Sequence, residues 1–382
     1  MAGGTSDLTE ESAAGSTSGA GRSTGDDEGR KFPCPQCGGE LVFNIGQQSL
    51  RCPYCGLVKE LTPADEIEEQ DFEAMLQKLG ELRATGVTDQ QETSEVRCDG
   101  CGANVVFQGN LTSSECPYCG SPLQRDHVHT SEVRVPVDGV LPFLVKREIA
   151  FRNLRDWVRS RWFAPNEFLK RGVEGRFNGV YFPYWTYDAM TFTRYQGQRG
   201  EHYYVTVRRN NQTHQERRTR WYPASGEFER FFDDVLTFAA NGLPSDLMQS
   251  LEPWPLQNCL KFNDELLAGF LSRTYDIPLD VGFGHARGRI EQAVASEARQ
   301  RIGGDEQRID RIATQYNGLT YKHLLLPVWM LAYRYHDKPY RVVVNAATGE
   351  VNGERPYSIV KIALAVMSAA SAAAGYAYLA GG

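Results

Sequence analysis

Motifs of catalysis and nucleotide binding are missing from this chain of 382 residues. The sequence has no Gly-x4-Gly-Lys-Ser/Thr loop to hold a nucleotide phosphate, no His-Glu-x-x-His pattern and no Gly-x-Ser-x-Gly pattern. The stretch 282–288 misses the spacing of a dinucleotide-binding fingerprint by one residue and is interpreted as the entry to a helix. We therefore expect no enzyme, no catalytic residue, no organic cofactor and no small-molecule substrate.

A general excess of positive charge is also absent. The chain has 41 Lys and Arg residues against 48 Asp and Glu residues, which gives a net charge of −7. This balance argues against a protein that coats nucleic acid, although one local basic patch remains compatible with it. Residues 1–30 hold a single leucine and no aromatic side chain, so they lack an apolar export signal and are expected to form a disordered tail.

Cysteine, in contrast, is abundant. Eight of the nine cysteines form two copies of Cys-x2-Cys-x14-Cys-x2-Cys, 64 residues apart, and both copies end in Cys-Pro-Tyr-Cys-Gly. In a reducing compartment such pairs bind metal more often than they form disulfides. The ninth, Cys259, is expected to be a small buried apolar side chain. The predicted metal ligands are Cys34, Cys37, Cys52 and Cys55 in the first ribbon, and Cys98, Cys101, Cys116 and Cys119 in the second.

These spacings predict two zinc ribbons, at 31–60 and 95–125, with rubredoxin-like knuckles and two Zn²⁺ ions per chain. Four thiolates at about 2.3 Å fill a tetrahedral sphere and leave no position for water, so each site is expected to be structural. Iron is the rival metal, because the spacing alone does not distinguish the two. The ribbons carry net charges of +1 and −1, which favours contact with protein over contact with nucleic acid.

Basic side chains are concentrated in one stretch, 194–220, which is interleaved with tyrosine and tryptophan. A single nucleic-acid strand, anionic lipid headgroups, or a solvated hairpin whose arginines pair with an acidic connector would each explain this composition. The arginines are Arg194, Arg199, Arg208, Arg209, Arg217, Arg218 and Arg220.

The rest of the chain predicts an acidic helical connector at 61–94 and an α+β region at 132–357. For the connector helix we expect Thr62 as N-cap. In the α+β region the patterns predict helices at 146–162 and 286–302, and strands within 176–222, 324–335 and 341–344. Asn210-Asn211 is expected to turn a hairpin. The segment 180–185 is echoed at 324–329, which indicates an internal duplication.

The C-terminal segment 359–380 is apolar, with nineteen uncharged residues from Ile362 to Ala380. At 1.5 Å per residue this helix nearly matches a bilayer core, and Lys361 can reach the interface. It predicts a tail anchor at the cytoplasmic face of the cell membrane. The alternative is a helix packed on protein through its alanine stripe, which would leave the chain cytoplasmic.

Several motifs resemble a known bacterial group. They are the Cys-Pro-x-Cys-Gly knuckles, Arg-Trp-Phe-Ala-Pro at 161–165, Gly-Val-Tyr-Phe-Pro-Tyr-Trp at 179–185, Leu-Leu-Pro-Val-Trp at 325–329 and Val-Asn-Ala-Ala-Thr-Gly-Glu-Val at 344–351. Over about 31–365 the chain is similar to bacterial proteins with a transcription-factor-IIB-type zinc ribbon, often with C-terminal membrane segments. Some members carry the label of primosomal replication-restart helicase, which the missing nucleotide loop contradicts here.

The resemblance implies an association with membrane-stress proteins and supplies no catalytic residue. Together with the ribbons and the apolar helix, it leads to the expectation of a zinc-binding, membrane-anchored adaptor that recruits cytoplasmic protein partners. The alternative is a nucleic-acid-associated factor of replication or transcription that uses the hairpin 194–220.

Overall fold

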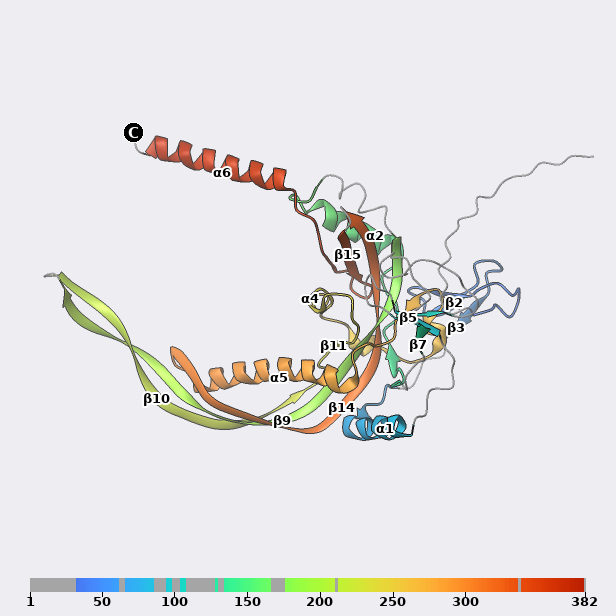
Figure 1. Cartoon of the computed structure of the whole chain (residues 1–382), viewed down its shortest axis with the longest axis horizontal. Coiled ribbons are helices and arrows are strands. Elements are labelled where there is room, and N and C mark those ends of the chain that lie inside the picture. The colour runs from blue at the N-terminus through green and yellow to red at the C-terminus, as the bar shows by residue number, and fades with distance from the viewer. Residues whose placement is uncertain are drawn as a thin grey trace, which may run out of the picture.

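A long, bowed and mainly antiparallel sheet runs through the centre of the molecule (Figure 1). The computed structural model describes residues 32–61, 66–85, 94–97, 104–107, 128–129, 134–165, 176–209, 212–335 and 338–380. Within these ranges ten strands join one sheet, with the main order β10-β9-β14-β15-β16. Those strands are β9 (Arg176–Arg209), β10 (Gln212–Phe232), β14 (Glu306–Tyr335), β15 (Lys338–Asn345) and β16 (Val351–Gly353).

Short strands and helices complete the described chain. The short strands of the large sheet are β4 (Gln70–Asp71), β8 (Gly139–Val140), β11 (Thr237–Phe238), β12 (Leu260–Lys261) and β13 (Leu271–Ser272). Two three-stranded sheets stand apart, β1 (Val42–Asn44) with β2 (Ser49–Arg51) and β3 (Val58–Glu60), and β5 (Ser94–Arg97) with β6 (Asn104–Phe107) and β7 (Val128–His129). The helices are α1 (Phe72–Ala84), α2 (Arg147–Arg159), α4 (Ser245–Gln249), α5 (Leu279–Ile302) and α6 (Ile359–Ala380), with 3-10 turns η2 (Leu256–Asn258) and η3 (Asp264–Leu267).

The middle of β9 is buried on both faces. Phe182 and Tyr184 face one apolar cluster together with Trp254, whereas Trp185 and Tyr187 face another. Successive side chains of a strand point to opposite faces, so this alternation of large apolar residues builds two cores from one strand. The strand is therefore the spine of the molecule.

Helix α5 lies along the concave side of the bowed sheet (Figure 1). It presents a buried stripe at every fourth position, formed by Gly282, Ala286, Ile290, Val294, Ala298 and Ile302. A Cβ atom at Gly282 would lie 2.5 Å from the Tyr187 hydroxyl and 2.6 Å from Trp185 Cδ1, so this glycine admits both rings. The predicted start at residue 286 is wrong, because α5 begins at Leu279. The stretch 282–288 lies inside the helix, because packing on the sheet outweighs the helix-weakening effect of its glycines.

The connector helix begins later than its sequence suggests. Thr62 lies outside the described residues, and α1 begins at Phe72, where the Asp71 carboxylate accepts a hydrogen bond from the Ala74 N–H at 2.7 Å. The residues before it form β4, which pairs with Thr320 and Tyr321 of β14. The expectation of Thr62 as the helix cap is therefore wrong, since a long-range strand pairing takes the preceding residues.

Most other sequence predictions of local structure agree with the described residues, but β14 begins at Glu306, well before the predicted strand start at 324. Helix α2 confirms a helix within 146–162, and β9 with β10 confirms the strands within 176–222. Arg209 pairs with Gln212, which leaves two residues between the strands; Asn210-Asn211 itself lies outside the described residues. The segments 180–185 and 324–329 lie side by side, with Phe182 opposite Leu326 in antiparallel pairing. The internal duplication stays a prediction.

Candidate metal centre

The first four predicted ligands come together in one sulfur cluster. Their Sγ atoms all lie within 4.8 Å of one another, with 3.6 Å between Cys34 and Cys55 and 3.5 Å between Cys37 and Cys52. Four sulfurs placed tetrahedrally at about 2.3 Å from one ion stand about 3.8 Å apart. The cluster therefore matches the size of a four-thiolate metal site, and it could hold a metal ion.

Two equivalent backbone turns produce this arrangement. The N–H of Cys34 donates to the Gly39 carbonyl at 2.6 Å, and the N–H of Cys52 donates to the Leu57 carbonyl at 2.8 Å. Each turn then passes through a glycine with positive φ, +72° at Gly38 and +78° at Gly56. Side chains other than glycine rarely adopt this conformation, which explains the glycine after each Cys-x-x-Cys pair.

Backbone donors favour the thiolate form of Cys52, whereas burial and hydrogen bonds with neighbouring cysteines raise the pKa of the Cys37 and Cys55 thiols. Hydrogen bonding from the Cys55 backbone lowers the pKa of the Cys52 thiol to about 6. Thiolates are the form that binds metal. The donor set consists of four soft sulfurs, which suits zinc or iron and leaves no open coordination position.

The ribbon is docked on the body of the protein. Cys34 and Cys52 are buried, and they belong to the same apolar cluster as Phe143 and Trp329 of the body. Across this boundary the Phe43 N–H donates to the Ala268 carbonyl at 3.2 Å. Two of the ligands thus face the protein interior, while Cys37 and Cys55 face outward.

The outward face of the ribbon carries exposed apolar side chains. Tyr54 is 77% exposed, and its ring covers Gly39, where a Cβ atom would lie 2.5 Å from Tyr54 Cδ2. Val58 is exposed on β3, which is an edge of the three-stranded sheet. The outward face of ribbon 1 is defined by these two exposed side chains, which are available for contact with another molecule.

The second predicted site lies outside the described residues, which exclude Cys98, Cys101, Cys116 and Cys119. Strands nearby still allow one comparison with ribbon 1. Arg97 of β5 pairs with Asn104 of β6, and the bridge between Pro33 and Glu40 occupies the positions 64 residues earlier. The backbone pairing around the first knuckle thus recurs at the offset that relates the two cysteine patterns.

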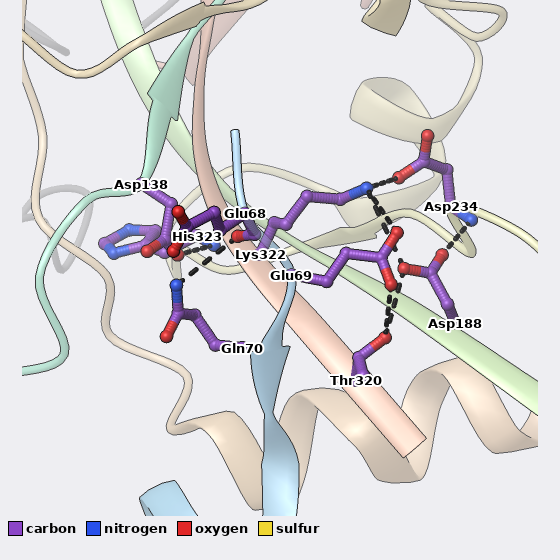
Figure 2. Close-up of polar contacts among 9 residues, drawn as sticks. All are labelled: Glu68, Glu69, Gln70, Asp138, Asp188, Asp234, Thr320, Lys322 and His323. Carbon is purple, nitrogen blue, oxygen red and sulfur yellow. Dashed lines mark hydrogen bonds and ion pairs between the residues drawn. The ribbon is translucent and has the colours of Figure 1, made fainter. Parts of the chain in front are cut away.

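An acidic cluster beside Lys322 is a further group that sequence reasoning missed, and Figure 2 shows its members Glu69 and Asp188 together with Asp234. Carboxylate oxygens of Glu69, Asp188 and Asp233 lie within 4.8 Å of one another. Lys322 already supplies a cation there, with Nζ at 2.9 Å from Asp234, 3.6 Å from Glu69 and 3.7 Å from Asp188. The positive charge that balances these carboxylates therefore comes in part from a side chain of the protein itself. Sequence reasoning missed the cluster because no pattern in the sequence links residues so far apart.

Burial and ion pairing act against each other in this cluster. Burial raises the pKa of Asp188 to about 6, although the Asp234 N–H and Lys322 both favour its carboxylate form. Burial also opposes the charged form of Lys322, yet its hydrogen bond and ion pair with Asp234 raise its pKa. Thr320 donates to Glu69 at 3.0 Å and thereby joins the residues before α1 to β14.

The arginines of the hairpin are partly neutralised by their own strands. Arg194 pairs with Glu227 at 3.2 Å and Arg199 with Glu201 at 2.9 Å, while Arg218 approaches Glu216 at 3.7 Å. The expectation that these three pair with the acidic connector is wrong. Strand pairing places Glu227 opposite Arg194, whereas Arg199 and Arg218 pair with glutamates two residues away on their own strands. Arg220 lies over the Tyr203 ring at 5.0 Å, and Arg217 faces Tyr204 across the strands.

Helix α6 projects from the body at the C-terminal end of the described chain (Figure 1). Ile359–Tyr376 is long and apolar enough to cross a membrane, with a mean hydropathy of 1.6, and none of this span is buried against the rest of the structure. Length and composition alone support this assignment, and a helix of a soluble protein can meet the same criteria.

The comparisons with known proteins give one curated relative. The chain is 26% identical over 345 residues to YdjG of Bacillus subtilis (strain 168), a protein described as uncharacterized, and the match covers 87% of this chain and 92% of the relative. No protein-family model matches the chain. No solved structure matches it either.

Proposed function

We propose that this protein is a zinc-binding, membrane-anchored adaptor that holds cytoplasmic protein partners near the membrane. The observation that carries the proposal is the apolar helix α6, whose candidate span has no buried residue. Transfer of so much apolar surface out of water is favourable, and a bilayer offers the matching length. The exposure of Ile359 and Val360 argues against the alternative of packing on this chain.

The metal centre supports the adaptor part of the proposal. Four thiolates leave no position for a reacting water, so the ion in ribbon 1 stabilises a fold. The second cysteine set repeats the spacing of the first, and we include a second Zn²⁺ ion per chain on that basis. The same proposal includes three further points. They are membership in the bacterial group with transcription-factor-IIB-type zinc ribbons, the link of that group to membrane stress, and the internal duplication.

Partner binding fits the outward face of ribbon 1 best. Tyr54 and Val58 are exposed apolar side chains on a rigid metal-bound element beside a free strand edge. Aromatic side chains of this kind dominate the binding energy of many protein interfaces. The ion pairs along the hairpin weaken the alternative of nucleic-acid binding, because phosphate contacts need unpaired positive charge.

Membrane fractionation of the full-length chain tests the anchor. We expect the wild type to stay in the membrane pellet after an alkaline wash that removes peripheral proteins. The variant with Val366→Lys and Ala370→Lys should move to the supernatant, since each charge near the centre of a helix costs about 2.5–3.5 kcal/mol on insertion. Extraction of the wild type by the same wash would contradict the anchor.

A second experiment tests the adaptor. Full-length chains with Tyr54→Ala or with the control Tyr376→Ala are cross-linked in membranes, and the attached proteins are compared. We expect the Tyr54 change to remove specific cross-linked partners that the control retains. If both variants retain the same partners as the wild type, the outward face of ribbon 1 is not the recruiting surface.

A further inference from the structure

Two adjacent aromatic side chains are exposed in the turn that follows α2. Trp162 is 73% exposed and Phe163 is 37% exposed, and their ring centroids lie 5.6 Å apart. The turn belongs to the Arg-Trp-Phe-Ala-Pro stretch, which the metal centre does not use. Adjacent large apolar rings on a surface indicate a surface that another molecule covers.

This turn lies directly against the beginning of α6. The Ser358 N–H donates to the Phe163 carbonyl at 2.8 Å, and Lys361 Nζ donates to the Ala164 carbonyl at 2.8 Å. Tyr357, the residue before, is 60% exposed. Three exposed aromatic side chains thus gather where the apolar helix leaves the body. Tryptophan and tyrosine concentrate at this level of a membrane protein, where one end of the ring is apolar and the other is hydrated.

Helix α2 adds positive charge beside the same turn. Its buried face holds Ala150, Leu154 and Val158, and its exposed side holds Arg152, Arg155 and Arg159. These arginines are spaced by three and four residues and therefore share one face of the helix. From Lys146 to Arg161 the chain has six basic and two acidic residues, a net of +4 in a protein whose total is −7.

We propose that the exposed face of α2 and the Trp162-Phe163 turn form a second membrane contact, which binds anionic lipid headgroups around the entry point of α6. The proposal rests on the membrane anchoring proposed above. Arginines attract the anionic surface, while the aromatic rings enter the interfacial layer beside α6. The sequence just before and at the start of α6 offers only Arg355 and Lys361 as positive charges, beside the acidic Glu354, whereas the fold brings α2 to the same place from far along the chain.

The attachment of α6 is compatible with this contact. Among the described residues, hydrogen bonds from α6 to the body end at Lys361. The helix can therefore pivot at its root to follow the bilayer normal, while Phe163 and Ala164 stay beside it. A lipid surface is favoured over a protein partner because the patch continues into an apolar helix of membrane length.

A vesicle-binding experiment isolates this contact from insertion of α6. The full chain with Val366→Lys and Ala370→Lys is mixed with vesicles of phosphatidylcholine alone or with added phosphatidylglycerol, and bound protein is measured by flotation. We expect binding to the anionic vesicles only, and weakening by salt. Adding Arg152→Ala, Arg155→Ala and Arg159→Ala should reduce binding on the order of 100-fold, at about fivefold per arginine.

A matched control removes three arginines from the hairpin instead, namely Arg194→Ala, Arg199→Ala and Arg218→Ala. We expect little change in binding from this control. A loss with the hairpin set and none with the α2 set would overturn the proposal, and so would an absence of binding to anionic vesicles. Circular dichroism of each variant checks that the surface changes leave the fold intact.

Tryptophan quenching in the reconstituted wild type supplies an independent readout. With bromine atoms placed near the headgroups of the lipids, we expect quenching that Trp162→Phe reduces. Equal quenching in both proteins would overturn the contact even where the alkaline wash supports the anchor. Conversely, quenching at Trp162 in a chain that the wash extracts would support the lipid contact and reject the anchor.

Discussion

The buried imidazole of His323 makes the stability of the fold depend on pH. Its side chain is almost fully buried, and its Nδ1 lies 3.2 Å from the Val135 carbonyl and 3.0 Å from the Pro136 carbonyl. Nδ1 must therefore carry a proton and donate, while Nε2 is buried without a partner. Burial lowers the pKa of His323 to about 4, against about 6.5 in an unfolded chain.

The sign follows from proton uptake. Between about pH 6.5 and pH 4 the unfolded chain binds a proton at this residue and the folded chain does not, so stability falls as the pH falls. The shift of about 2.5 units corresponds to about 3.4 kcal/mol in total. Integrated from about pH 7.5 to pH 4.5, the His323 contribution is a loss of about 2.5 kcal/mol in the free energy of unfolding.

Other groups change over the same range, so a matched variant is needed. Asp138 accepts a hydrogen bond from the His323 backbone N–H at 2.7 Å, yet burial raises its pKa to about 6. The folded chain therefore protonates Asp138 first, which adds stability in acid. Protonation of the cysteine ligands acts in both proteins alike. In His323→Gln the side-chain amide keeps a donor and removes the titration.

Urea unfolding in detergent, at about pH 7.5 and about pH 4.5, measures how much stability full-length wild type and His323→Gln each lose on acidification. Trp185, whose ring centroid lies 4.5 Å from that of His323, contributes to the fluorescence change. We expect the wild type to lose about 2.5 kcal/mol more than the variant on acidification. Equal losses in the two proteins would refute the reasoning that His323 is held neutral by burial.

Three further predictions follow from particular contacts. Gly282→Ala should lower the free energy of unfolding, measured by urea unfolding, by about 1–3 kcal/mol, because the added Cβ meets the Tyr187 and Trp185 rings. Gly284→Ala, where the added Cβ has open space, should raise it by about 0.5–1 kcal/mol, and the opposite order would count against the packing of α5. Lys322→Met should lower the free energy of unfolding by about 3–5 kcal/mol, because it leaves Asp188 buried without its cation. Adding Asp188→Asn to this variant should recover part of the loss, and no recovery would exclude the ion pair as the cause. Cys34→Ser should remove one zinc per chain as measured by metal analysis, and an unchanged content would show that ribbon 1 holds no zinc.

The chemistry of the site could be predicted from the sequence because it depends on short spacings. The two Cys-x-x-Cys-Gly segments of ribbon 1 each form their own turn, with hydrogen bonds that span five residues, such as Cys34 to Gly39. The helix α2, the long hairpin and the apolar helix α6 could be predicted for the same reason, since their periodic patterns are local.

Features that depend on distant pairings could not be predicted in this way. The start of α1 at Phe72 is decided by pairing of β4 with β14, about 250 positions later in the chain. The beginning of α5 depends on two rings of β9 that fit over Gly282, a residue whose intrinsic preference weakens a helix. Lys322 belongs to a cluster whose members come from four separate segments.

The docking of ribbon 1 has a consequence for the proposed adaptor function. One apolar cluster contains the predicted metal ligands Cys34 and Cys52, the buried face of α2 with Leu154, and Ala164 at the root of α6. In a close-packed core the side chains leave few voids, so the elements that contribute to it are fixed relative to one another. A partner held on the outward face of ribbon 1 would therefore be held at a fixed place relative to the root of α6. Loss of the metal would destabilise ribbon 1, and its outward face would no longer be held at a fixed position relative to the proposed membrane contact. Zinc would therefore influence partner recruitment through the packing of this core.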